Sequence, residues 1–300
     1  MMSNKSLIYI AGPTAVGKTK ISIELAKKFN TEIISCDSRQ FYEELKIGTA
    51  PPTLEELREV KHHFIQNKSI KEIYTVGDFE KEAINKINAL FNNYETLIMV
   101  GGSGLYADAI MFGLDKFPKI PKEIRNQINL FYKTHGLKAL QELLLEKDPK
   151  YYTRIDKNNH VRLIRALEVC ISSGKPYSSF IGKIKSNRKF ISKMAIIELP
   201  REKLYVQINK RVDLMVNVGL EKEVKNLFSY RHYPALNTVG YKELFPFFEG
   251  KIKFEDAISE IKKNTRRYAK RQITWLKKYE NALYFKNSTP ITEIYNLLVK

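Results

Sequence analysis

Short apolar runs and amphipathic stretches alternate along the first third of the chain. The apolar runs are rich in β-branched residues and too short for helices, so they predict buried strands at 6–11, 31–36 and 96–100. The stretches between them place apolar side chains at helical spacing and predict helices at 18–29 and 78–92. Strands that alternate with helices favour a doubly wound α/β fold with a parallel sheet.

The hydrophobic pattern changes after about residue 115. Helical spacing without a strand pattern runs from 120 to 182 and is followed by the polar residues 186–188. The later elements are predicted to be one strand and two long helical regions, at 193–199, 201–229 and 254–280. We therefore expect an α/β core domain with an α-helical insertion domain, divided as 1–115 and 189–300 for the core and 116–188 for the insertion.

Basic residues outnumber acidic ones by a wide margin. The 300-residue chain has 51 Lys and Arg against 33 Asp and Glu, which gives a formal net charge of +18. A surplus of this size favours a polyanionic partner such as nucleic acid. The lysines are spread widely, so a basic surface kept only for solubility also accounts for the total.

Cysteine usage and the length of the apolar runs disfavour several classes of protein. The two cysteines, Cys36 and Cys170, lie far apart, and the absence of a CxxC pair or Cys/His cluster argues against zinc and disulfides. We expect two reduced, buried thiols. No apolar run reaches the roughly 18–20 residues of a membrane span, and the N-terminal run is too short for a secretory signal. We therefore expect a cytoplasmic protein with no membrane partner.

A phosphate-binding loop follows the first predicted strand and opens the first predicted helix. It fits the pattern G-x-x-x-x-G-K-[ST], with Gly12, Pro13, Thr14, Ala15, Val16, Gly17, Lys18 and Thr19. Its glycines let the backbone direct several N–H groups at phosphate oxygens, and the helix N-terminus adds partial positive charge. Lys18 supplies a full charge, and Thr19 can hold Mg²⁺. The loop indicates a phosphorylated ligand without specifying a reaction.

Two further strand ends are predicted to lie beside this loop. Asp37 and Ser38 directly follow the second strand, at the sheet edge where open α/β folds bind ligands. The Asp37 carboxylate could accept a proton from an attacking group, or it could cap the next helix. The third strand ends in GGSGLY at 101–106, where a typical NTPase carries an Asp that holds Mg²⁺. The glycines argue against ATP hydrolysis and allow either close approach of a substrate backbone or a tight turn.

Together these motifs resemble the tRNA dimethylallyltransferase family, also called tRNA isopentenyltransferases, in its bacterial form. The resemblance spans about residues 7–278 and keeps the family's order. Pro51 and Gln66 depart from the family pattern, which usually has lysine and aspartate at these two positions. The other elements that carry the resemblance are Asp37–Tyr42, Ile47–Ala50, His62–Ile65, Val76–Phe79, Arg162–Glu168, Val239–Glu243 and Thr265–Trp275.

The resemblance implies transfer of a dimethylallyl group from dimethylallyl diphosphate to N6 of the adenosine 3′ of the tRNA anticodon. The phosphate-binding loop then holds the donor's diphosphate with Mg²⁺ rather than ATP. By analogy, Asp37 hydrogen-bonds or deprotonates N6, and Thr14 lies near the reacting carbon or the bridging oxygen. Arg211 binds the diphosphate from the far side, and together with Lys18 these residues form the implied catalytic set. The family also suggests a monomer.

The resemblance also implies a set of RNA contacts. Ser103 stands where the family has a threonine that contacts tRNA, and the insertion at 116–188 clasps the anticodon stem. The run 262–278 holds eight Lys or Arg and no acid, which independently favours RNA contact. Its aromatic residues, Tyr268 and Trp275, are predicted to be buried in the core. The complete expected set is Asp37, Ser38, Arg39, Gln40, Ser103, Arg125, Val161, Arg162, Leu163, Ile164, Arg165, Arg266, Arg267, Lys270 and Arg271.

Three other functions compete with this interpretation. An adenylate isopentenyltransferase would use the same donor with free AMP, ADP or ATP, but a small nucleotide needs no long basic helix. A P-loop kinase of a small metabolite would need the Mg²⁺-holding Asp that the third strand lacks. A non-catalytic RNA-binding module would not need Lys18, Thr19 and Asp37. His62 and His63 are adjacent and point in different directions, so we expect a structural role for them rather than metal ligation.

Overall fold

The computed structural model describes residues 5–183 and 187–300. By their internal contacts, the residues form two compact units. The first, here called the core unit, consists of Met1–Met111 and Asn187–Lys300, and the second, the helical unit, is Phe112–Ser186. These limits lie within a few residues of the division expected at 116–188.

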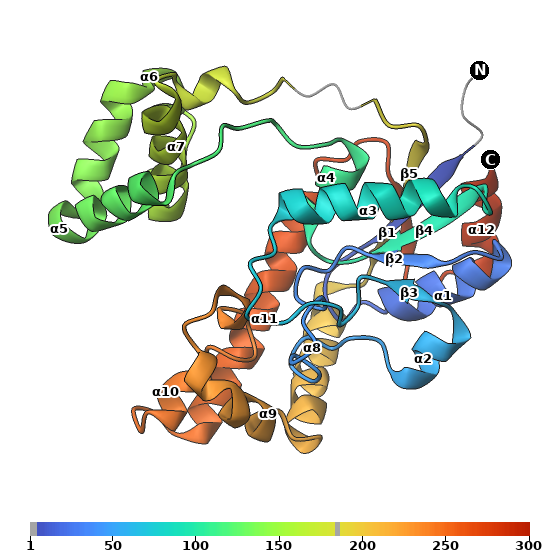
Figure 1. Ribbon diagram of the computed structural model, residues 1–300. Helices are drawn as coiled ribbons and strands as arrows, with labels where there is room; N and C mark the ends of the chain where they lie inside the picture. The colour runs from blue at the N-terminus through green and yellow to red at the C-terminus, as the bar shows by residue number, and fades with distance from the viewer. Residues whose placement is uncertain (1–4, 184–186) are drawn as a thin grey trace. The chain divides into compact units, whose positions relative to one another are not determined.

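A parallel sheet forms the centre of the core unit (Figure 1). Within the described residues it has six strands in the order β3-β2-β4-β1-β5-β6. In chain order the strands are β1 (Ser6–Ala11), β2 (Ile33–Ser35), β3 (His62–His63), β4 (Thr96–Val100), β5 (Ile191–Glu198) and β6 (Leu283–Lys286). Every pair of neighbouring strands is parallel, with Ser6 of β1 in register with Thr96 and Ile191. The expected α/β fold with a parallel sheet is confirmed.

Helices cover both faces of this sheet. One face packs against α3 (Val76–Leu90) and α4 (Gly104–Met111). The other face packs against α1 (Lys18–Lys28), α8 (Arg201–Asn217) and α12 (Ile291–Val299). Burial on both faces explains why the strands are continuous apolar runs rather than alternating ones.

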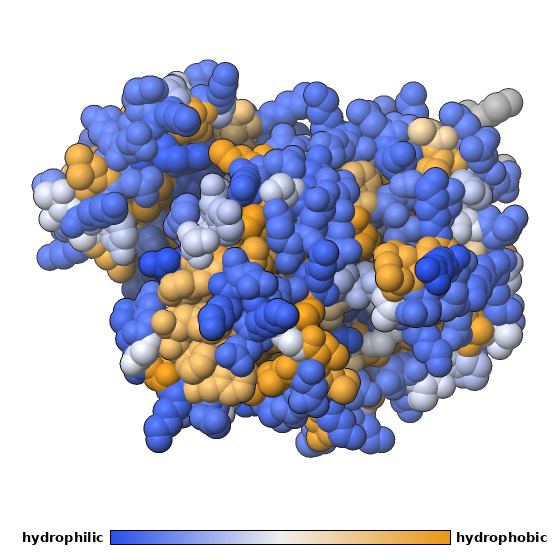
Figure 2. All heavy atoms as spheres, turned by 60° about the horizontal axis from the view of Figure 1, so that its bottom comes forward, coloured by the Kyte–Doolittle hydropathy of each residue, from blue (hydrophilic) through white to orange (hydrophobic). Residues whose placement is uncertain are grey.

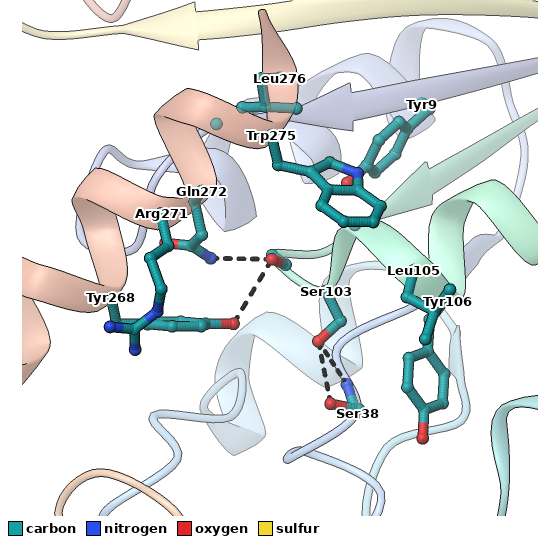
Figure 3. A pocket seen from close by; sticks show the side chains of 13 residues that line it. Tyr9, Ser38, Ser103, Leu105, Tyr106, Tyr268, Arg271, Gln272, Trp275 and Leu276 are labelled. Carbon is teal, nitrogen blue, oxygen red and sulfur yellow. Dashed lines mark hydrogen bonds between the residues drawn. The ribbon is translucent and has the colours of Figure 1, made fainter. Parts of the chain in front are cut away.

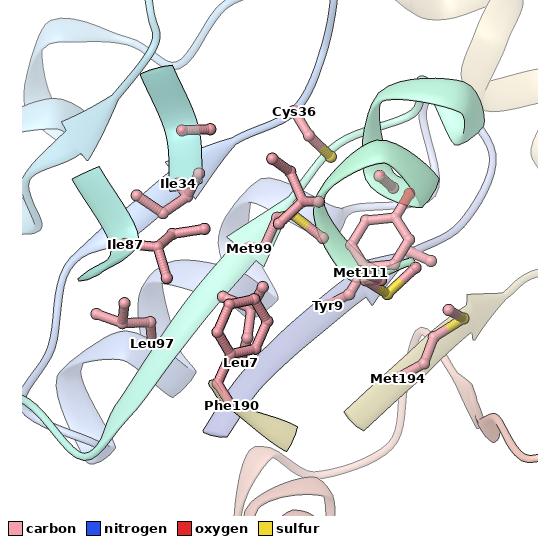
Figure 4. Packing of buried hydrophobic residues seen from close by; sticks show 14 of the residues in the cluster. Leu7, Tyr9, Ile34, Cys36, Ile87, Leu97, Met99, Met111, Phe190 and Met194 are labelled. Carbon is pink, nitrogen blue, oxygen red and sulfur yellow. The ribbon is translucent and has the colours of Figure 1, made fainter. Parts of the chain in front are cut away.

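Alternate side chains of β1 show this division directly. Leu7 and Tyr9 belong to the hydrophobic cluster under α3 and α4, whereas Ile8 and Ile10 belong to the opposite cluster. Figure 4 shows Leu7 and Tyr9 packed with Met99 of the neighbouring strand. Successive side chains of β1 therefore alternate between the two apolar faces, as the pleat of a strand requires.

The helix α11 (Phe254–Leu276) links the two faces at the carboxyl edge of the sheet. Its Ala269 packs in one cluster and its Leu276 in the other. A third cluster, centred on Tyr241 and Leu45, joins α11 to shorter helical elements. These are α9 (Leu220–Leu227), α10 (Phe245–Phe248), η2 (Phe228–Tyr230) and η3 (Pro234–Leu236). The helix α2 (Leu54–Glu59) lies outside that cluster.

The helical unit is built from helices alone over its described residues, which agrees with the pattern of its sequence. They are α5 (Lys122–Lys147), α6 (Pro149–Tyr152), α7 (His160–Ser173) and η1 (Tyr177–Ser179). Gly136 has a φ of 77° and interrupts α5. The buried Asp148 accepts hydrogen bonds from the N–H and hydroxyl of Ser178, which ties the end of α5 to η1.

The sequence did not predict every element. The strands β3 and β6 and the helix α12 were missed, and the helical region expected at 201–229 is divided at Gly219, whose φ is 103°. Within residues 5–183 and 187–300, no helix is both long enough and apolar enough to cross a membrane. On the face drawn in Figure 2, hydrophilic residues predominate and hydrophobic ones form separate patches.

Candidate active site

Three loops meet at the carboxyl edge of the sheet, where α/β folds bind ligands. The phosphate-binding loop follows β1, the segment Asp37–Gln40 follows β2, and the glycine-rich turn 101–104 follows β4. Residues from all three loops line connected cavities together with residues of α8 and α11. The structure therefore brings together the three motifs that the sequence placed at strand ends.

The phosphate-binding loop has the backbone of an anion site. Gly12 and Gly17 have φ values of 149° and 97°, and a β-carbon on Gly12 would lie 2.7 Å from the carbonyl oxygen of Ile197. Ala15 adopts a φ of 65° without being glycine, so the loop holds local strain. Because α1 begins at Lys18, the N–H groups of its first turn have no partner within the helix and remain available to an anion.

Two desolvated cations face this loop. The Lys18 ammonium donates to the carbonyl oxygen of Pro13 at 2.9 Å. Burial lowers the pKa of Lys18 to about 8, Asp37 opposes this shift, and the positive charge of Arg211 adds to it. Burial also lowers the pKa of Arg211. Two cations that repel each other in a desolvated pocket favour a ligand that carries several negative charges.

Thr14 lies between these cations and α11. Its hydroxyl oxygen accepts a hydrogen bond from Arg211 Nη1 at 3.5 Å, and its backbone N–H donates to Gln272 Oε1 at 2.8 Å. Thr14 and Arg211, two members of the implied catalytic set, are therefore in direct contact in the structure. Gln272 belongs to one of the motifs that carry the family resemblance, but no role was predicted for it.

Asp37 has a role in the local turn and also faces the cavities. Its Oδ1 accepts a hydrogen bond from the N–H of Arg39 at 3.1 Å, which is the capping geometry of an Asx turn. The same residue lines two cavities, one shared with Lys18 and Thr19 and the other with Arg271. No helix begins within residues 38–53, so the Asp37 carboxylate stabilises a turn rather than capping a helix, and it also faces the cavities.

The two cavities that contain Asp37 share much of their lining. Thr14, Arg211, Thr49 and Ala50 line both of them. A ligand bound on the phosphate-binding loop therefore lies directly beside the space that Asp37 opens onto. This arrangement suits a transfer reaction between two ligands that enter adjoining cavities.

A third cavity lies on the other side of Ser38, between the glycine-rich turn and α11 (Figure 3). Ser103 Oγ accepts a hydrogen bond from the N–H of Ser38 at 3.0 Å, and the two hydroxyls are also 3.0 Å apart. Leu105 and Trp275 line this cavity with exposed apolar surface, and Arg271 lines it as well. Apolar and aromatic side chains beside a cation suit a nucleobase and its phosphate.

The glycines of the turn after β4 make room for the protein's own helix. A β-carbon on Gly102 would clash with the Gln272 amide, and one on Gly104 would clash with the Trp275 indole. The sequence allowed close approach of a substrate backbone at these glycines, or a tight turn. The groups that approach them are instead side chains of α11.

The predicted burial of Trp275 in the core is wrong. Its indole is 36% exposed, and the Lys278 ammonium lies 3.9 Å from the ring centroid. The core-facing positions of α11 are Ala269, Gln272 and Leu276, so the buried face of the helix is rotated away from Trp275. Tyr268 is only partly buried, and its hydroxyl donates to the carbonyl oxygen of Gly102 at 3.4 Å.

The exposed face of α11 is basic. Arg267, Lys270 and Arg271 are exposed and line a shallow groove together with Trp275 and Lys278. Arg266 differs from the others, because its guanidinium donates to Asn209 Oδ1 at 2.8 Å and lies over the Tyr205 ring. Arg266 therefore binds groups of α8. The other expected RNA contacts of this helix, Arg267, Lys270 and Arg271, are exposed to solvent.

In the helical unit, the expected RNA-contacting residues divide into two groups. Val161 and Arg162 are exposed, and Arg125 and Arg165 both bind the buried carboxylate of Glu168. Arg165 also lies over the Phe117 ring, with its guanidinium carbon 5.3 Å from the centroid. In contrast, Leu163 and Ile164 pack in the core of the unit, which removes their side chains from the expected contact.

Residues 40–279 match the family model described as IPP transferase. The chain belongs to the IPP transferase family. A tRNA dimethylallyltransferase of Flavobacterium psychrophilum is 52% identical over 98% of this chain and 99% of the relative. The relative from Christiangramia forsetii, with the same description, is 54% identical over 95% of this chain and 94% of its own length.

Solved structures of this family share the fold. A tRNA isopentenylpyrophosphate transferase from Bacillus halodurans is 37% identical and superposes with a TM-score of 0.72, over 98% of this chain and 96% of that chain. A eukaryotic dimethylallyltransferase described as acting on tRNA has 28% identity and a TM-score of 0.81, over 95% of this chain and 74% of that chain. The similarity therefore covers both units rather than the phosphate-binding loop alone.

Glu223, which the sequence analysis did not single out, holds the loop 46–50 beside the cavities. The Glu223 carboxylate accepts hydrogen bonds from the backbone N–H groups of Lys46, Ile47 and Gly48 at 2.9–3.1 Å, and from the Tyr241 hydroxyl at 2.6 Å. From the other side, the Gln40 amide donates to the Ala50 carbonyl at 2.9 Å. A lone Glu on an amphipathic helix gives no sequence signal for such a role.

His62 and His63 contact neighbouring groups of the core unit. His63 Nε2 lies 2.5 Å from Glu32 Oε2, and His62 Nδ1 lies 2.8 Å from the Val60 carbonyl oxygen. Cys36 is a free, buried thiol, as is Cys170 of the helical unit. Among the residues described, no three His, Cys, Asp or Glu side chains are grouped to hold a metal ion.

Proposed function

We propose that this chain transfers the dimethylallyl group of dimethylallyl diphosphate to N6 of the adenosine 3′ of the anticodon in tRNA. The observation that carries the proposal is the pair of adjoining cavities, which share Thr14, Asp37 and Arg211. One cavity suits the diphosphate and the other an acceptor group. The relatives named tRNA dimethylallyltransferase, 52% and 54% identical, support this function over transfer to a free nucleotide.

The reaction breaks the bond between the allylic carbon and the bridging oxygen and forms a bond from N6 to that carbon. The electron pair of the broken bond leaves with the diphosphate, so negative charge develops on the leaving group. Lys18, Arg211 and the N–H groups at the start of α1 surround the place where this charge appears. Such preorganised cations and dipoles stabilise a departing anion without rearranging during the reaction.

The attacking N6 is a poor nucleophile because its lone pair is delocalised into the adenine ring. Its extra proton must leave as the new bond forms, and Asp37 is the carboxylate that lines both cavities. We assign the acceptance of that proton to Asp37. The Thr14 hydroxyl, held by Arg211, lies on the donor side of the same space.

The donor set of the first cavity also suits Mg²⁺. The Thr19 hydroxyl and the Asp37 carboxylate line it, and Mg²⁺ prefers such oxygen ligands together with phosphate oxygens and water. When bound with the diphosphate, Mg²⁺ neutralises part of the leaving group's charge. Thr19 is the residue we assign to hold it.

The acceptor adenosine must leave its stack to reach the cavity beside Asp37. In a single-stranded anticodon loop the free energy needed to unstack the base is small. The exposed arginines of α11 and the Arg125–Arg165 pair of the helical unit are the groups we assign to the RNA backbone. A tRNA substrate implies that the protein works in the cytoplasm.

The test is direct transfer of label. Purified protein with Mg²⁺ and labelled dimethylallyl diphosphate is given unmodified tRNA or AMP, and we expect label in the tRNA adenosine only. Asp37→Asn is expected to reduce kcat by about 10²–10⁴-fold, whereas the exposed Asp256→Asn leaves it unchanged. Label in AMP and never in tRNA overturns the proposed acceptor. Full activity of the Asp37→Asn protein overturns the role given to this carboxylate.

A further inference from the structure

Gln272 is a polar side chain buried among groups of the site. It is 6% exposed and lies on the core-facing side of α11, between Ala269 and Leu276. Its Oε1 accepts from the N–H of Thr14 at 2.8 Å, and its Nε2 donates to the carbonyl oxygen of Gly102 at 2.9 Å. One amide group thus joins the loop after β1 to the turn after β4, and Figure 3 shows its contact with the turn.

The two contacts need one donor and one acceptor at the end of the same side chain. Among side chains of this length, only glutamine offers both in a neutral group. The backbone groups it binds are a donor on Thr14 and an acceptor on Gly102, and a buried backbone group without a partner is costly. A core position on a helix is ordinarily filled by an apolar side chain. The amide at this position is therefore explained by its hydrogen bonds to the two loops and not by packing.

Gly102 supports the same conclusion from the opposite side. A β-carbon there would clash with Gln272 Nε2, so glycine is the residue that allows the amide to reach the carbonyl. The hydroxyl of Tyr268, one turn earlier on α11, donates to the same carbonyl oxygen at 3.4 Å. The helix α11 therefore binds the Gly102 carbonyl through two side chains, Tyr268 and Gln272.

The residues that Gln272 fixes are those assigned to the reaction. Thr14 lines both adjoining cavities and accepts from Arg211, and the turn at Gly102 leads to Ser103, which bonds Ser38. The same helix presents Arg267, Lys270 and Arg271 on its exposed face. A displacement of α11 would therefore also move the Gln272 amide that binds the backbone N–H of Thr14.

We propose that Gln272 is a positioning residue that sets Thr14 and the Gly102–Ser103 turn at their working separation, and that it does so from the helix that carries the basic RNA-facing groups. This inference rests on the proposed function for its activity readout. The positioning of Thr14 by Gln272 does not rest on the proposed function, because the placement of Thr14 affects diphosphate binding whatever the acceptor is.

The first experiment replaces the amide with an apolar group of similar length, Gln272→Met. We expect kcat to fall about 10–100-fold, since small misplacements of reacting groups have effects of this size. We also expect weaker binding of inorganic pyrophosphate with Mg²⁺, with the affinity for unmodified tRNA changed less than twofold. Gln207→Met, at an exposed position of α8 that lines no cavity named above, is the matched control and should match the wild type.

The second experiment uses the clash at Gly102. Gly102→Ala alone should lower kcat because its methyl group displaces the amide. In a Gln272→Ala background the same change should have little further effect, because the shortened side chain leaves room for the methyl group. Non-additivity of this kind is the mark of two residues acting through one contact.

The outcomes separate the possibilities. A lower melting temperature of Gln272→Met with unchanged kcat and pyrophosphate affinity would show a purely structural role and overturn the proposal. Additive effects of Gly102→Ala and Gln272→Ala would also overturn it. If the wild type transfers no label to tRNA, the proposed function fails, while weaker pyrophosphate binding by Gln272→Met still supports the placement of Thr14.

Discussion

Lys18 is under opposing electrostatic demands in the site. It must be charged to bind a diphosphate, yet burial and the neighbouring Arg211 lower its pKa to about 8. A fraction of the protein therefore carries a neutral Lys18 in mildly alkaline solution. Binding of a polyanion favours the charged form and takes up a proton wherever that fraction is present.

This conflict predicts a pH dependence of diphosphate binding. The affinity for inorganic pyrophosphate with Mg²⁺, divided by that of Lys18→Met at the same pH, should fall as the pH rises through about 8. Calorimetric titrations between pH 6.5 and 9.5 would measure it. Lys18→Met should bind weakly and should keep only the pH dependence that comes from the titration of pyrophosphate itself. A ratio that stays constant to pH 9.5 would contradict the lowered pKa.

The same residue is predicted to reduce the stability of the ligand-free protein. The pKa of Lys18 is lower in the folded chain, about 8, than its ordinary value of 10.5. The unfolded chain therefore binds more protons between these values, and the destabilisation is complete below pH 8 and disappears as the pH rises towards 10.5. Because the side chain is partly exposed, Lys18→Met should raise the free energy of unfolding at pH 7 by only about 1 kcal/mol. Urea unfolding at pH 7 in the absence of pyrophosphate measures this, and a less stable variant would contradict it.

At the scale of elements, the loop 46–50 depends on one carboxylate of a helix distant in sequence. Glu223 on α9 accepts from three successive N–H groups of this loop, whose Thr49 and Ala50 line both cavities. Ala50 has a φ of 47°, which a non-glycine residue adopts only when its surroundings hold it there. The Glu223 carboxylate of α9 thus helps to hold the shape of this loop, together with the Gln40 amide at Ala50.

We predict that Glu223→Gln weakens the hydrogen bonds that hold the loop 46–50 beside the cavities. The amide has a single acceptor oxygen for the four donors that now share a carboxylate, and its own N–H groups face the loop's donors. We expect the free energy of unfolding to fall by about 1–2 kcal/mol and kcat/KM to fall about tenfold. Thermal unfolding and steady-state kinetics check both. Glu221→Gln, exposed on the same helix, should change neither, and equal effects of the two variants would argue against a specific clamp.

Elements with a continuous apolar run were predictable from sequence, and edge elements were not. The strand β1 lies in the middle of the sheet and its alternate residues are buried on opposite faces, so its pattern is unambiguous. The edge strand β6 has one buried residue, Phe285, and β3 has two residues that are only partly buried. Such strands exist because a neighbour offers a ladder of hydrogen bonds, which their own composition does not record.

The site divides in the same way. The phosphate-binding loop and Asp37 were predictable because their chemistry depends on the local backbone at a strand end. Trp275 was assigned to the core from helical spacing, but spacing fixes only the angle between side chains and not which face of α11 meets the sheet. Gln272 and Glu223 act on segments far away in sequence, so only the folded chain shows which groups they bind.

For the whole molecule, the net charge of +18 sets the expected response to salt. Many of the basic side chains are engaged locally, as with Arg188 and Glu80 or Lys262 and Asp213. The exposed face of α11 is different, because Arg267, Lys270 and Arg271 line one groove. If this groove contacts the RNA backbone, its contribution depends on where the charges lie and not on their total.

Neutralising this groove should therefore flatten the salt dependence of tRNA binding. The triple variant Arg267→Gln, Lys270→Gln and Arg271→Gln should bind more weakly. The slope of log K against log salt is negative, and its magnitude should decrease by about 0.7 for each RNA phosphate that the groove no longer neutralises. A control with the same net charge changes the exposed Lys222, Lys225 and Lys253 to Gln, away from the groove. Because that control removes equal charge and leaves the groove intact, its slope should stay close to that of the wild type. Slopes reduced equally in the two triple variants would show that α11 acts only through the overall charge of the molecule. Slopes unchanged in both would place the RNA elsewhere.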